Sequence, residues 1–490
     1  MIGGTDLKIC LIAEGCYPYI VGGVSSWVQQ LIRNFPEHEY VLYTIMPDSS
    51  KKGKFLYNLP ANVSGTKEIF LNDVSLKSEK GSGKIPKATI TAKWEIDEIR
   101  RLMMSNLDQW NMIFDFFQRS DHMIRNFLLG SDFYDIISEV YRKQYADTRF
   151  VDFVWTMRSM YMTLFHVLNN PPPKADLYHS VSTGYAGIAG AMAKHLYGGR
   201  LLITEHGIYS REREEEIITA AWVQKSFKKL WIEYFKSLSL GAYRAADRLI
   251  ALFDTNRRIQ IELGADPMQC EVISNGVNVE GFSNLPGKTD AESQYLNVGA
   301  VIRVTPIKDI KTMLYAFDIV KRQVPNAHFY LIGPTDEAPE YFQECQSLAQ
   351  ELNIGDLQFT GRVNVKEYIG RMDVMVLTSI SEGQPLALME AMAAGVPCVS
   401  TNVGSCKELF NGKQGDSLGL AGLLAPIMDY EQIAEHIVKI LTTPDLKKIL
   451  GETGRKRMIQ FYSEQRFSEA YRRLYDELDP TKEGKTPWPV

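Results

Sequence analysis

Cysteine and long apolar runs are scarce in this chain, and their scarcity disfavours several classes of protein. The 490 residues include six cysteines, and no two form a C-x-x-C pair, so neither a disulfide framework nor a structural zinc site is expected. No segment reaches the roughly 18 uninterrupted apolar residues of a membrane-spanning helix. The longest near-candidate, 386–399, is interrupted by Glu390, Gly395 and Pro397. The first residues show no signal-peptide pattern. We therefore expect a cytoplasmic protein.

An excess of positive charge is also lacking. The chain has 54 Lys and Arg against 59 Asp and Glu, a net charge of −5 with His neutral, which is unlike the basic balance of a nucleic-acid binder. Its 45% hydrophobic content is too high for a disordered chain. A large enzyme and a large binding protein both remain compatible with this composition.

Short β-rich runs alternate with helical patterns along most of the chain. This alternation predicts an α/β fold of two doubly wound, Rossmann-like halves with parallel sheets. A fully apolar run such as 374–377 is typical of a strand covered on both faces. The predicted strands are 8–13, 40–45, 177–181, 200–204, 248–252, 271–274, 295–301, 327–332, 357–360, 374–377 and 396–401.

The domain boundaries follow from composition. The Gly-, Asn-, Ser- and Pro-rich segment 275–290 is predicted to link the halves, with an N-terminal domain at 1–285 and a C-terminal domain at 286–463. The last helix, 464–490, is expected to cross back to the N-terminal domain. Residues 76–173 interrupt the alternation and predict a helical insertion with its own core, or a docking surface for a partner or a membrane. Because ligands of such sheets bind outside the carboxyl ends of the strands, a ligand is expected in the cleft between the halves.

The most specific motif is S-E-G-Q-P-L-A-L-M-E-A at 381–391. Glu382 lies in a loop, and Glu390 lies about one and a half turns into the following helix, where a carboxylate can accept hydrogen bonds from ribose hydroxyls. Gly383 permits close approach of a ligand, and Pro385 suits the first helical position. Backbone amides at the helix start can face sugar hydroxyls or phosphate oxygens, and they belong to Gln384, Leu386 and Ala387. Two glutamates at this spacing are common by chance, but the full context is not.

A pair of cations stands between the first strand and the first helix of the second half. Arg303 and Lys308 are five residues apart, so they can straddle a diphosphate, with Arg as a planar fork and Lys as a mobile point charge. The alternative is a pair of ordinary surface cations.

The first half has two weaker features. Gly22 and Gly23 precede a helix, so backbone can approach an anion there, although an ordinary tight turn explains them equally well. His206 follows a strand within T-E-H-G-I-Y-S-R-E-R-E, at 204–214, and can donate a hydrogen bond to a substrate or be a structural histidine. Arg211 and Arg213 can pair with neighbouring glutamates on a solvated helix face, or belong to an acceptor surface.

At this point the sequence resembles a known family. Glu382 and Glu390, with Gly383 and Pro385, match the E-x7-E motif of retaining GT-B glycosyltransferases of family GT4. The resemblance to this family covers nearly the whole chain. The stretches 14–19, 22–27 and 204–214 resemble, more narrowly, the PelF-type transferases of Pel exopolysaccharide synthesis. One departure is Ile302, which stands where the family has a glycine before the arginine.

The resemblance implies a role for each of these residues. Glu390 would hold the ribose, Glu382 would contact the donor sugar, and Arg303 and Lys308 would stabilise the departing diphosphate. His206 would contact the transferred sugar, and with Glu382, Arg303 and Lys308 it forms the expected catalytic set. The expected nucleotide-sugar site comprises Gly22, Gly23, Arg303, Lys308, Glu382, Gly383, Gln384, Pro385, Leu386, Ala387 and Glu390. The acceptor-side candidates are Tyr19, Glu205, Tyr209, Arg211 and Arg213.

The expected activity is transfer of a hexose or N-acetylhexosamine from a UDP-sugar to a growing exopolysaccharide, with retention of configuration. No metal and no cofactor are expected, and the chain contains no D-x-D motif. The resemblance implies a polysaccharide acceptor and inner-membrane exopolysaccharide synthesis proteins as partners, which could recruit the protein to that membrane. The alternatives are a nucleotide-sugar epimerase of the same fold and a catalytically silent nucleotide-binding scaffold of an export complex.

Overall fold

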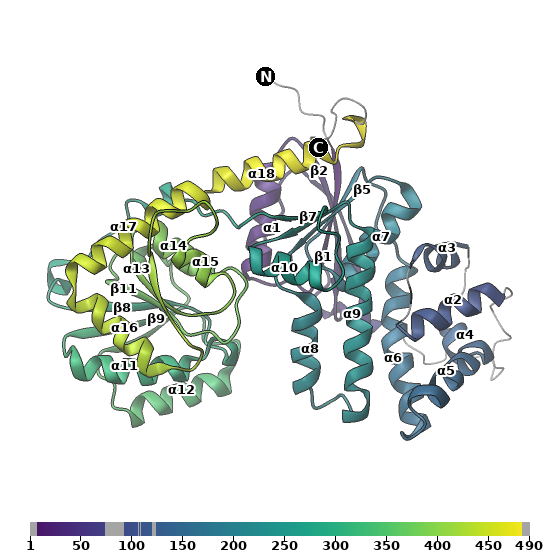
Figure 1. Ribbon diagram of the computed structural model, residues 1–490, viewed down its shortest axis with the longest axis horizontal. Coiled ribbons are helices and arrows are strands. Elements are labelled where there is room, and N and C mark those ends of the chain that lie inside the picture. The colour runs from purple at the N-terminus through teal and green to yellow at the C-terminus, as the bar shows by residue number, and fades with distance from the viewer. Residues whose placement is uncertain (1–6, 74–92, 106, 108, 120–123, 483–490) are drawn as a thin grey trace. The chain divides into compact units, whose positions relative to one another are not determined.

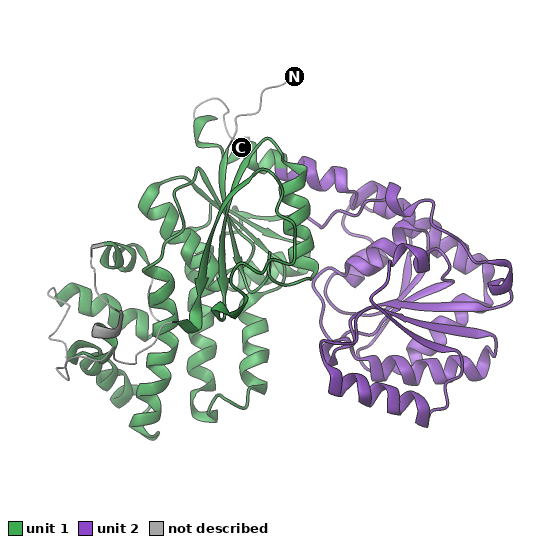
Figure 2. Ribbon diagram, turned by 180° about the vertical axis from the view of Figure 1, so that it is seen from behind, with its two compact units in different colours: residues 1–272, 472–490 green, residues 273–471 purple. Residues whose placement is uncertain are grey.

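The computed structural model describes residues 7–73, 93–105, 107, 109–119 and 124–482. The chain divides into two compact units, which we call unit 1, residues 1–272 and 472–490, and unit 2, residues 273–471 (Figure 2). The first part of the predicted insertion, 76–92, lies outside the described residues. None of the described helices is long and apolar enough to span a membrane.

Unit 1 is built on a parallel sheet of seven strands in the order β3-β2-β1-β4-β5-β6-β7. The chain order reverses between β1 and β4, as in a doubly wound fold. The central strands are almost wholly buried, which explains their apolar composition. The strands are β1 (Lys8–Glu14), β2 (Glu39–Met46), β3 (Val63–Phe70), β4 (Leu177–Ser180), β5 (Arg200–Glu205), β6 (Arg248–Ala251) and β7 (Cys270–Val272).

Helices cover both sides of this sheet, with α1 on one side and α7 on the other (Figure 1). Helix α7 packs against β1, β4 and β5 and also against α9. The helices outside the insertion are α1 (Gly23–Asn34), α7 (Gly184–Tyr197), α8 (Tyr209–Thr219), α9 (Lys228–Ala245) and α10 (Asp254–Glu262).

The predicted insertion is helical in its described part. It contains α2 (Lys93–Met103), α3 (Asn111–Arg119), α4 (Ile124–Leu129), α5 (Ser131–Gln144) and α6 (Phe150–Leu168). The expectation of a separate core is wrong, because its buried side chains join one continuous cluster with those of the sheet and of α7 and α9. Trp110 lies so close to Gly241 of α9 that a Cβ at Gly241 would meet the indole at 2.2 Å. The insertion therefore extends the core of unit 1.

Unit 2 has a parallel sheet of six strands in the order β10-β9-β8-β11-β12-β13, with its own buried core. The strands are β8 (Leu296–Val301), β9 (Ala327–Ile332), β10 (Leu357–Gly361), β11 (Val374–Leu377), β12 (Cys398–Thr401) and β13 (Gly422–Ala425). The helices are α11 (Ile310–Gln323), α12 (Pro339–Glu351), α13 (Lys366–Ile369), α14 (Leu386–Ala393), α15 (Cys406–Asn411), α16 (Tyr430–Thr442), α17 (Pro444–Phe461) and α18 (Glu464–Glu477). Two doubly wound parallel sheets confirm the predicted α/β class.

The units divide at 272/273, whereas the sequence places the boundary at 285/286. The reason is that the connecting segment is hydrogen-bonded within unit 2. The Asn275 amide donates to the Gln384 side chain, and the Val277 amide donates to the Tyr462 carbonyl. These bonds place residues 273–285 in unit 2.

Helix α18 belongs to both units, because the second division falls inside it, at 471/472, and not at its start. Its C-terminal part contacts unit 1 through side chains. Tyr475 shares a 2.9 Å hydrogen bond with His179 of β4, and Arg472 pairs with Glu37.

Candidate active site

The predicted residues of unit 2 gather at the carboxyl edge of its sheet. The chain order reverses between β8 and β11, the point at which open α/β sheets bind ligands. The loops that follow these two strands are bonded to each other. The Thr378 hydroxyl donates to the carbonyls of Lys308 and Asp309, each at 3.0 Å, and the Ile380 amide donates to the Ile307 carbonyl at 2.9 Å.

The loop after β8 carries both predicted cations. The exposed Arg303 side chain pairs with Glu337 at 2.7 Å. Lys308 ends the short 3-10 turn Pro306–Lys308, and Asp309 then begins α11 with a left-handed φ of 47°. Ile302 is buried in the core, and its amide donates to the Ile332 carbonyl. This loop therefore accommodates a side chain where the GT4 pattern has glycine.

Lys308 and Glu382 form the ion pair at the centre of this edge. Both side chains are largely buried, and the Ser379 hydroxyl donates to the same Glu382 oxygen at 2.6 Å. The two charged groups are more than 70 residues apart in the sequence. They meet because β8 and β11, the strands that precede them, are neighbours in the sheet. Arg303, Lys308 and Glu382 thus lie in two loops that follow neighbouring strands of one sheet.

The loop 382–385 is held tightly against a neighbouring turn. The Gly383 carbonyl accepts from the Ser405 amide at 2.9 Å. Gly404, with φ +53°, lies so near that a Cβ there would meet the Gly383 oxygen at 2.2 Å, so this turn requires glycine. The loop is thereby pre-organised for ligand contact.

Helix α14 begins one residue later than expected, with Pro385 as its N-cap and Leu386 and Ala387 in its first turn. Gln384 is buried, and its side-chain NH2 group has no hydrogen-bond partner among the described residues. A ligand hydroxyl or phosphate oxygen would satisfy that donor, since buried donors without a partner are costly.

Glu390 is the fifth residue of α14 and is half-buried. Burial raises its pKa to about 7, and the Lys366 ammonium offsets only part of that rise. The carboxylate is therefore poised to accept hydrogen bonds that would stabilise its charged form.

In unit 1, Gly22 and Gly23 stand at the start of α1. Neither has a left-handed φ, since Gly22 is extended at 178°, and a Cβ on either would meet no atom within 4 Å. The fold itself therefore does not require glycine at these two positions, whereas close approach of a ligand would. Tyr19, an acceptor-side candidate, is instead buried against Phe55.

His206 lies at the end of β5 with its ring edge-on to Trp27, at 4.6 Å between ring centroids. Its Nε2 atom is buried and has no hydrogen-bond partner among the described residues. Burial lowers the pKa of His206 to about 4, so the imidazole is neutral near pH 7. A neutral ring with an unpartnered nitrogen can exchange a hydrogen bond with a substrate.

Glu205, another acceptor-side candidate, is an interior residue with 1% exposure. Its carboxylate accepts four hydrogen bonds of 2.8–3.0 Å, and their donors are Thr183, Tyr209, Tyr243 and Gln260. All four bonds stabilise the charged form against burial, which raises the pKa of Glu205. This carboxylate holds the loop after β5 in place and does not present itself to an acceptor.

Two of the remaining candidates, Tyr209 and Arg213, act on a carboxylate that the sequence pattern does not single out. Glu14, at the end of β1, accepts from the Tyr209 hydroxyl at 3.0 Å and from the Ala186 amide at 3.1 Å. The Arg213 guanidinium lies 5.1 Å from the Tyr209 ring, and Arg211 is exposed on α8. Burial raises the pKa of Glu14, and Arg213 partly offsets the rise. The carboxyl-edge rule could have found Glu14, because it ends the central strand.

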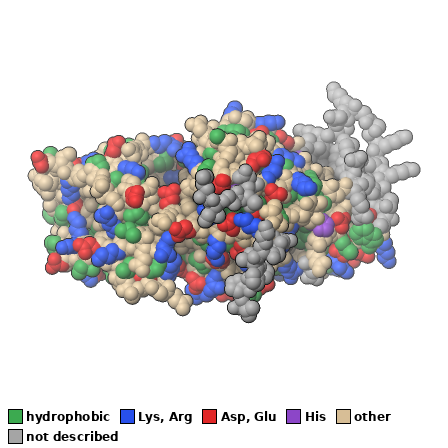
Figure 3. All heavy atoms as spheres, turned by 90° about the horizontal axis from the view of Figure 1, so that it is seen from above, with side chains coloured by type: hydrophobic (Ala, Val, Ile, Leu, Met, Phe, Trp, Pro, Cys, Tyr) green, Lys and Arg blue, Asp and Glu red, His purple; other side chains and the backbone are tan. Residues whose placement is uncertain are grey.

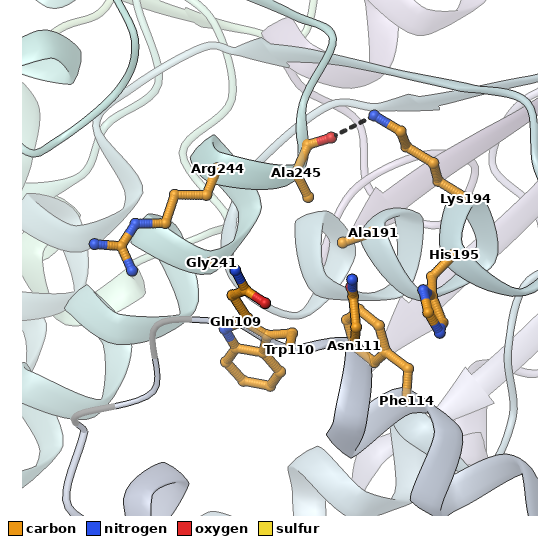
Figure 4. A pocket seen from close by; sticks show the side chains of 10 residues that line it. All are labelled: Gln109, Trp110, Asn111, Phe114, Ala191, Lys194, His195, Gly241, Arg244 and Ala245. Atoms are coloured by element: carbon orange, nitrogen blue, oxygen red, sulfur yellow. Dashed lines mark hydrogen bonds between the residues drawn. The ribbon is translucent and has the colours of Figure 1, made fainter. Parts of the chain in front are cut away.

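A separate pocket of about 700 Å³ lies between the insertion and helices α7 and α9 (Figure 4). Its lysine is already engaged, since Lys194 donates to the Ala245 carbonyl at 2.9 Å and pairs with Asp247 at 2.8 Å. His195 contacts Asp115 at 2.8 Å. The pocket contains no predicted site residue and lies away from the carboxyl edge of the sheet.

Among the described residues, no group of three or more His, Cys, Asp or Glu side chains is arranged to hold a metal ion. In unit 2 the Lys308–Glu382 ion pair stands at the centre of the predicted residues, and in unit 1 His206 contacts Trp27 while Tyr209 bonds to Glu14.

Comparison with known proteins identifies relatives of both units. Residues 283–457 match the family Glycosyl transferases group 1, and residues 7–268 match a family described as Domain of unknown function (DUF3492). The chain is 25% identical over 329 residues to an Escherichia coli UDP-Gal:alpha-D-GlcNAc-diphosphoundecaprenol alpha-1,3-galactosyltransferase, covering 64% of this chain and 78% of that protein. It is 31% identical over 202 residues to the Bacillus anthracis N-acetyl-alpha-D-glucosaminyl L-malate synthase, covering 41% of this chain and about half, 49%, of that protein.

Solved structures share the fold. Sucrose-phosphate synthase from Thermosynechococcus elongatus superimposes with a TM-score of 0.60 at 18% identity, covering 96% of this chain and 99% of that one. Anabaena HepE, in complex with UDP and glucose, gives 0.58 at 14% identity with 96% and 99% coverage. The predicted GT-B fold class is confirmed. The DUF3492 match covers more than half of the 490-residue chain, and the second unit of the chain carries a domain that matches Glycosyl transferases group 1. The chain therefore belongs to the DUF3492 family.

Proposed function

We propose that the protein is a retaining, metal-independent hexosyltransferase that moves a hexose or N-acetylhexosamine from a UDP-sugar to a growing, Pel-like exopolysaccharide. The observation that carries this proposal is the convergence of Lys308, Glu382 and the start of α14 at the carboxyl edge of one sheet. Two similar proteins support UDP as the carrier, since the Escherichia coli protein is named for UDP-Gal and HepE was solved with UDP.

The cluster suits the electrostatics of glycosyl transfer. Positive charge develops at the anomeric carbon while the diphosphate leaves with negative charge, so fixed cations at the diphosphate lower the barrier. We assign Lys308 and Arg303 to the diphosphate. Each is held by a carboxylate in the structure, Lys308 by Glu382 and Arg303 by Glu337, so the ligand would take over these ammonium and guanidinium groups.

The two glutamates take different parts of the donor in this proposal. Glu382, positioned by Ser379, would accept hydrogen bonds from the donor sugar, and Glu390 would accept them from the ribose. The neutral His206 would contact the transferred sugar. No covalent nucleophile is assigned, in keeping with front-face attack.

The cellular setting is part of the same proposal. The acceptor would be the polysaccharide itself, the protein would act on the cytoplasmic side, and inner-membrane exopolysaccharide synthesis proteins would be its partners. The Escherichia coli relative is named for a diphosphoundecaprenol-linked sugar, which supports a reaction close to a membrane.

A donor panel tests the activity. We expect one UDP-sugar, among UDP-, GDP- and ADP-sugars, to bind the full chain and to be consumed only with acceptor. Lys308→Ala should weaken that binding roughly 10- to 100-fold, the value of a charge-assisted bond. Lys311→Ala is the matched control, because the half-exposed Lys311 of α11 also pairs with a glutamate, Glu344.

Several outcomes would overturn parts of this proposal. If none of the sugars binds, the protein is not a transferase, and the catalytically silent scaffold is the remaining hypothesis. Release of an epimer or a free sugar without acceptor would indicate the epimerase. Turnover that disappears in EDTA and returns with Mg²⁺ would contradict metal independence.

The histidine is tested by separating turnover from affinity. His206→Ala should lower kcat at least roughly tenfold while the affinity for the UDP-sugar changes little, since a contact to the transferred sugar acts mainly in the transition state. His195→Ala, on α7 of the same unit, should leave both unchanged. Wild-type kcat in His206→Ala would show that this histidine is only structural.

A further inference from the structure

Helices α8 and α9 form a hairpin that projects from the sheet of unit 1 (Figure 1). The end of α8 and the turn that follows it expose large apolar side chains. Trp222 is 66% exposed, and Ile218 is also exposed. The turn is nevertheless ordered by its own core contacts, because Val223 and Phe227 are buried and Trp222 packs edge-on against Trp231 at 5.5 Å.

The same turn is basic. Residues 217–230 contain three lysines and no acidic residue. Lys228 has a structural part, since it donates to the Ile218 carbonyl at 2.5 Å and so caps the end of α8. Lys225 and Lys229 are exposed, and neither forms an ion pair with another described residue. Their charges are therefore available to a partner.

The start of α6 extends this surface. Phe153 of α6 lies 6.1 Å from Phe227 between ring centroids, which places the two segments side by side. Val151 and Trp155 are exposed there, Trp155 by 57%, and the Arg149 side chain is 86% exposed. We call the set Val151, Trp155, Ile218, Trp222, Lys225 and Lys229 the hairpin-end surface.

Across the face drawn in Figure 3, cationic and anionic side chains are interspersed. At the hairpin end, exposed tryptophans stand beside unpaired lysines on a projecting turn. Tryptophan prefers the boundary between lipid headgroups and acyl chains, and lysine is attracted to anionic headgroups. Such an amphipathic end inserts only a few ångströms and needs no spanning helix.

We propose that the hairpin-end surface is a peripheral membrane contact that binds a lipid surface carrying anionic headgroups. Trp222, Ile218, Trp155 and Val151 enter the headgroup boundary, while Lys225 and Lys229 lie over the anionic phosphates. This contact goes beyond the proposed transfer reaction and does not depend on it.

Vesicle sedimentation with the full chain tests the contact. We expect binding to phosphatidylcholine vesicles that contain about one third phosphatidylglycerol, little binding to phosphatidylcholine alone, and weakening by salt. The triple variant Trp222→Ala, Lys225→Glu, Lys229→Glu should bind at least roughly 25-fold more weakly, about fivefold for each lysine. The matched control is Lys448→Glu, Ile449→Ala, Lys456→Glu on exposed positions of α17, and it should bind like the wild type.

A second measurement follows the tryptophan itself. Brominated lipids should quench the fluorescence of the wild type on anionic vesicles, and the conservative variant Trp222→Phe should bind with clearly less quenching. The proposal is overturned by absent vesicle binding, by equal binding of the triple variant, or by equal loss in the α17 control. A last outcome also overturns the proposal: the wild type captures solubilised membrane proteins but binds no vesicle, and the triple variant loses that capture. The surface would then be an interface with a protein.

Discussion

At the scale of single residues, Glu390 is the most informative group, because its charge state is set by burial and is open to change by a ligand. Its pKa is raised from the ordinary 4.5 to about 7. The folded chain therefore binds this proton more tightly than the unfolded chain does. The resulting contribution to stability is present below pH 4.5 and is lost as the pH rises to about 7.

A pH prediction follows for nucleotide binding. If the Glu390 carboxylate accepts ribose hydroxyls, UDP affinity should rise roughly tenfold between pH 6 and pH 8, as the ionised fraction grows around a pKa near 7. Calorimetric titration of wild type and Glu390→Gln would measure this, with the variant correcting for titration of UDP itself. Equal pH profiles in the two proteins would contradict a ribose role for Glu390.

Some site residues could be predicted from sequence, and others could not. Arg303, Lys308, Glu382 and Glu390 stand in loops and helix starts with a recognisable local pattern, and the structure places them at one sheet edge. The interior position of Glu205, in contrast, could not be predicted from a local pattern. Its neighbours on the chain suggest a cleft, but its carboxylate is buried and accepts hydrogen bonds from three donors in distant segments, Thr183, Tyr243 and Gln260.

At the scale of elements, the buried Arg457 ties α17 to the turn after α15. Its guanidinium donates two hydrogen bonds to the Asp416 carboxylate, at 2.5 and 3.2 Å, and one each to the carbonyls of Leu409, Phe410 and Gly419. Five contacts to one fully buried cation compensate for its loss of hydration.

We therefore predict that Arg457→Leu destabilises unit 2 by about 3–5 kcal/mol, because it leaves Asp416 buried without its partner. Adding Asp416→Leu should restore part of the loss. Hydrogen exchange of β12 and β13 would measure the effect, and Arg455→Leu, exposed on the same helix, is the control. A loss in Arg455→Leu as large as in Arg457→Leu would show that the helix, and not the buried pair, is responsible.

Two strands were missed because their sequences do not read as strands. β3, V-S-G-T-K-E-I-F, is an edge strand paired only with β2, and its polar residues and glycine reflect its exposed side. β13 is a four-residue edge strand that begins with glycine. The central strands were predicted because burial on both faces demands continuous apolar residues.

At the scale of the whole molecule, α18 links the two units, and its last turns complete unit 1. Leu474, Tyr475 and Leu478 are buried, and Tyr475 bonds to His179 in the sheet. Unit 1 is therefore built from both ends of the chain.

Ending the chain after Tyr471 should destabilise unit 1 by at least about 3 kcal/mol, since each buried apolar side chain contributes about 1.5–3 kcal/mol. Hydrogen exchange should show lost protection in β1 and β4 with little change in β8 and β11. Ending the chain after Lys482 is the control and should leave both units unchanged. Equal protection of β1 and β4 in the shorter chain would contradict a stabilising part for these last turns.

The sequence by itself determined the α/β class, the two parallel sheets and the cations and carboxylates of unit 2, because strand and helix periodicity and loop motifs are local properties. Only the tertiary structure decided that the insertion shares the core of unit 1, that Glu14 meets Tyr209, and that residues 273–285 belong to unit 2. These outcomes depend on contacts between segments far apart in the chain. Such contacts are selected by packing and hydrogen bonding of the folded whole, and no local pattern records them.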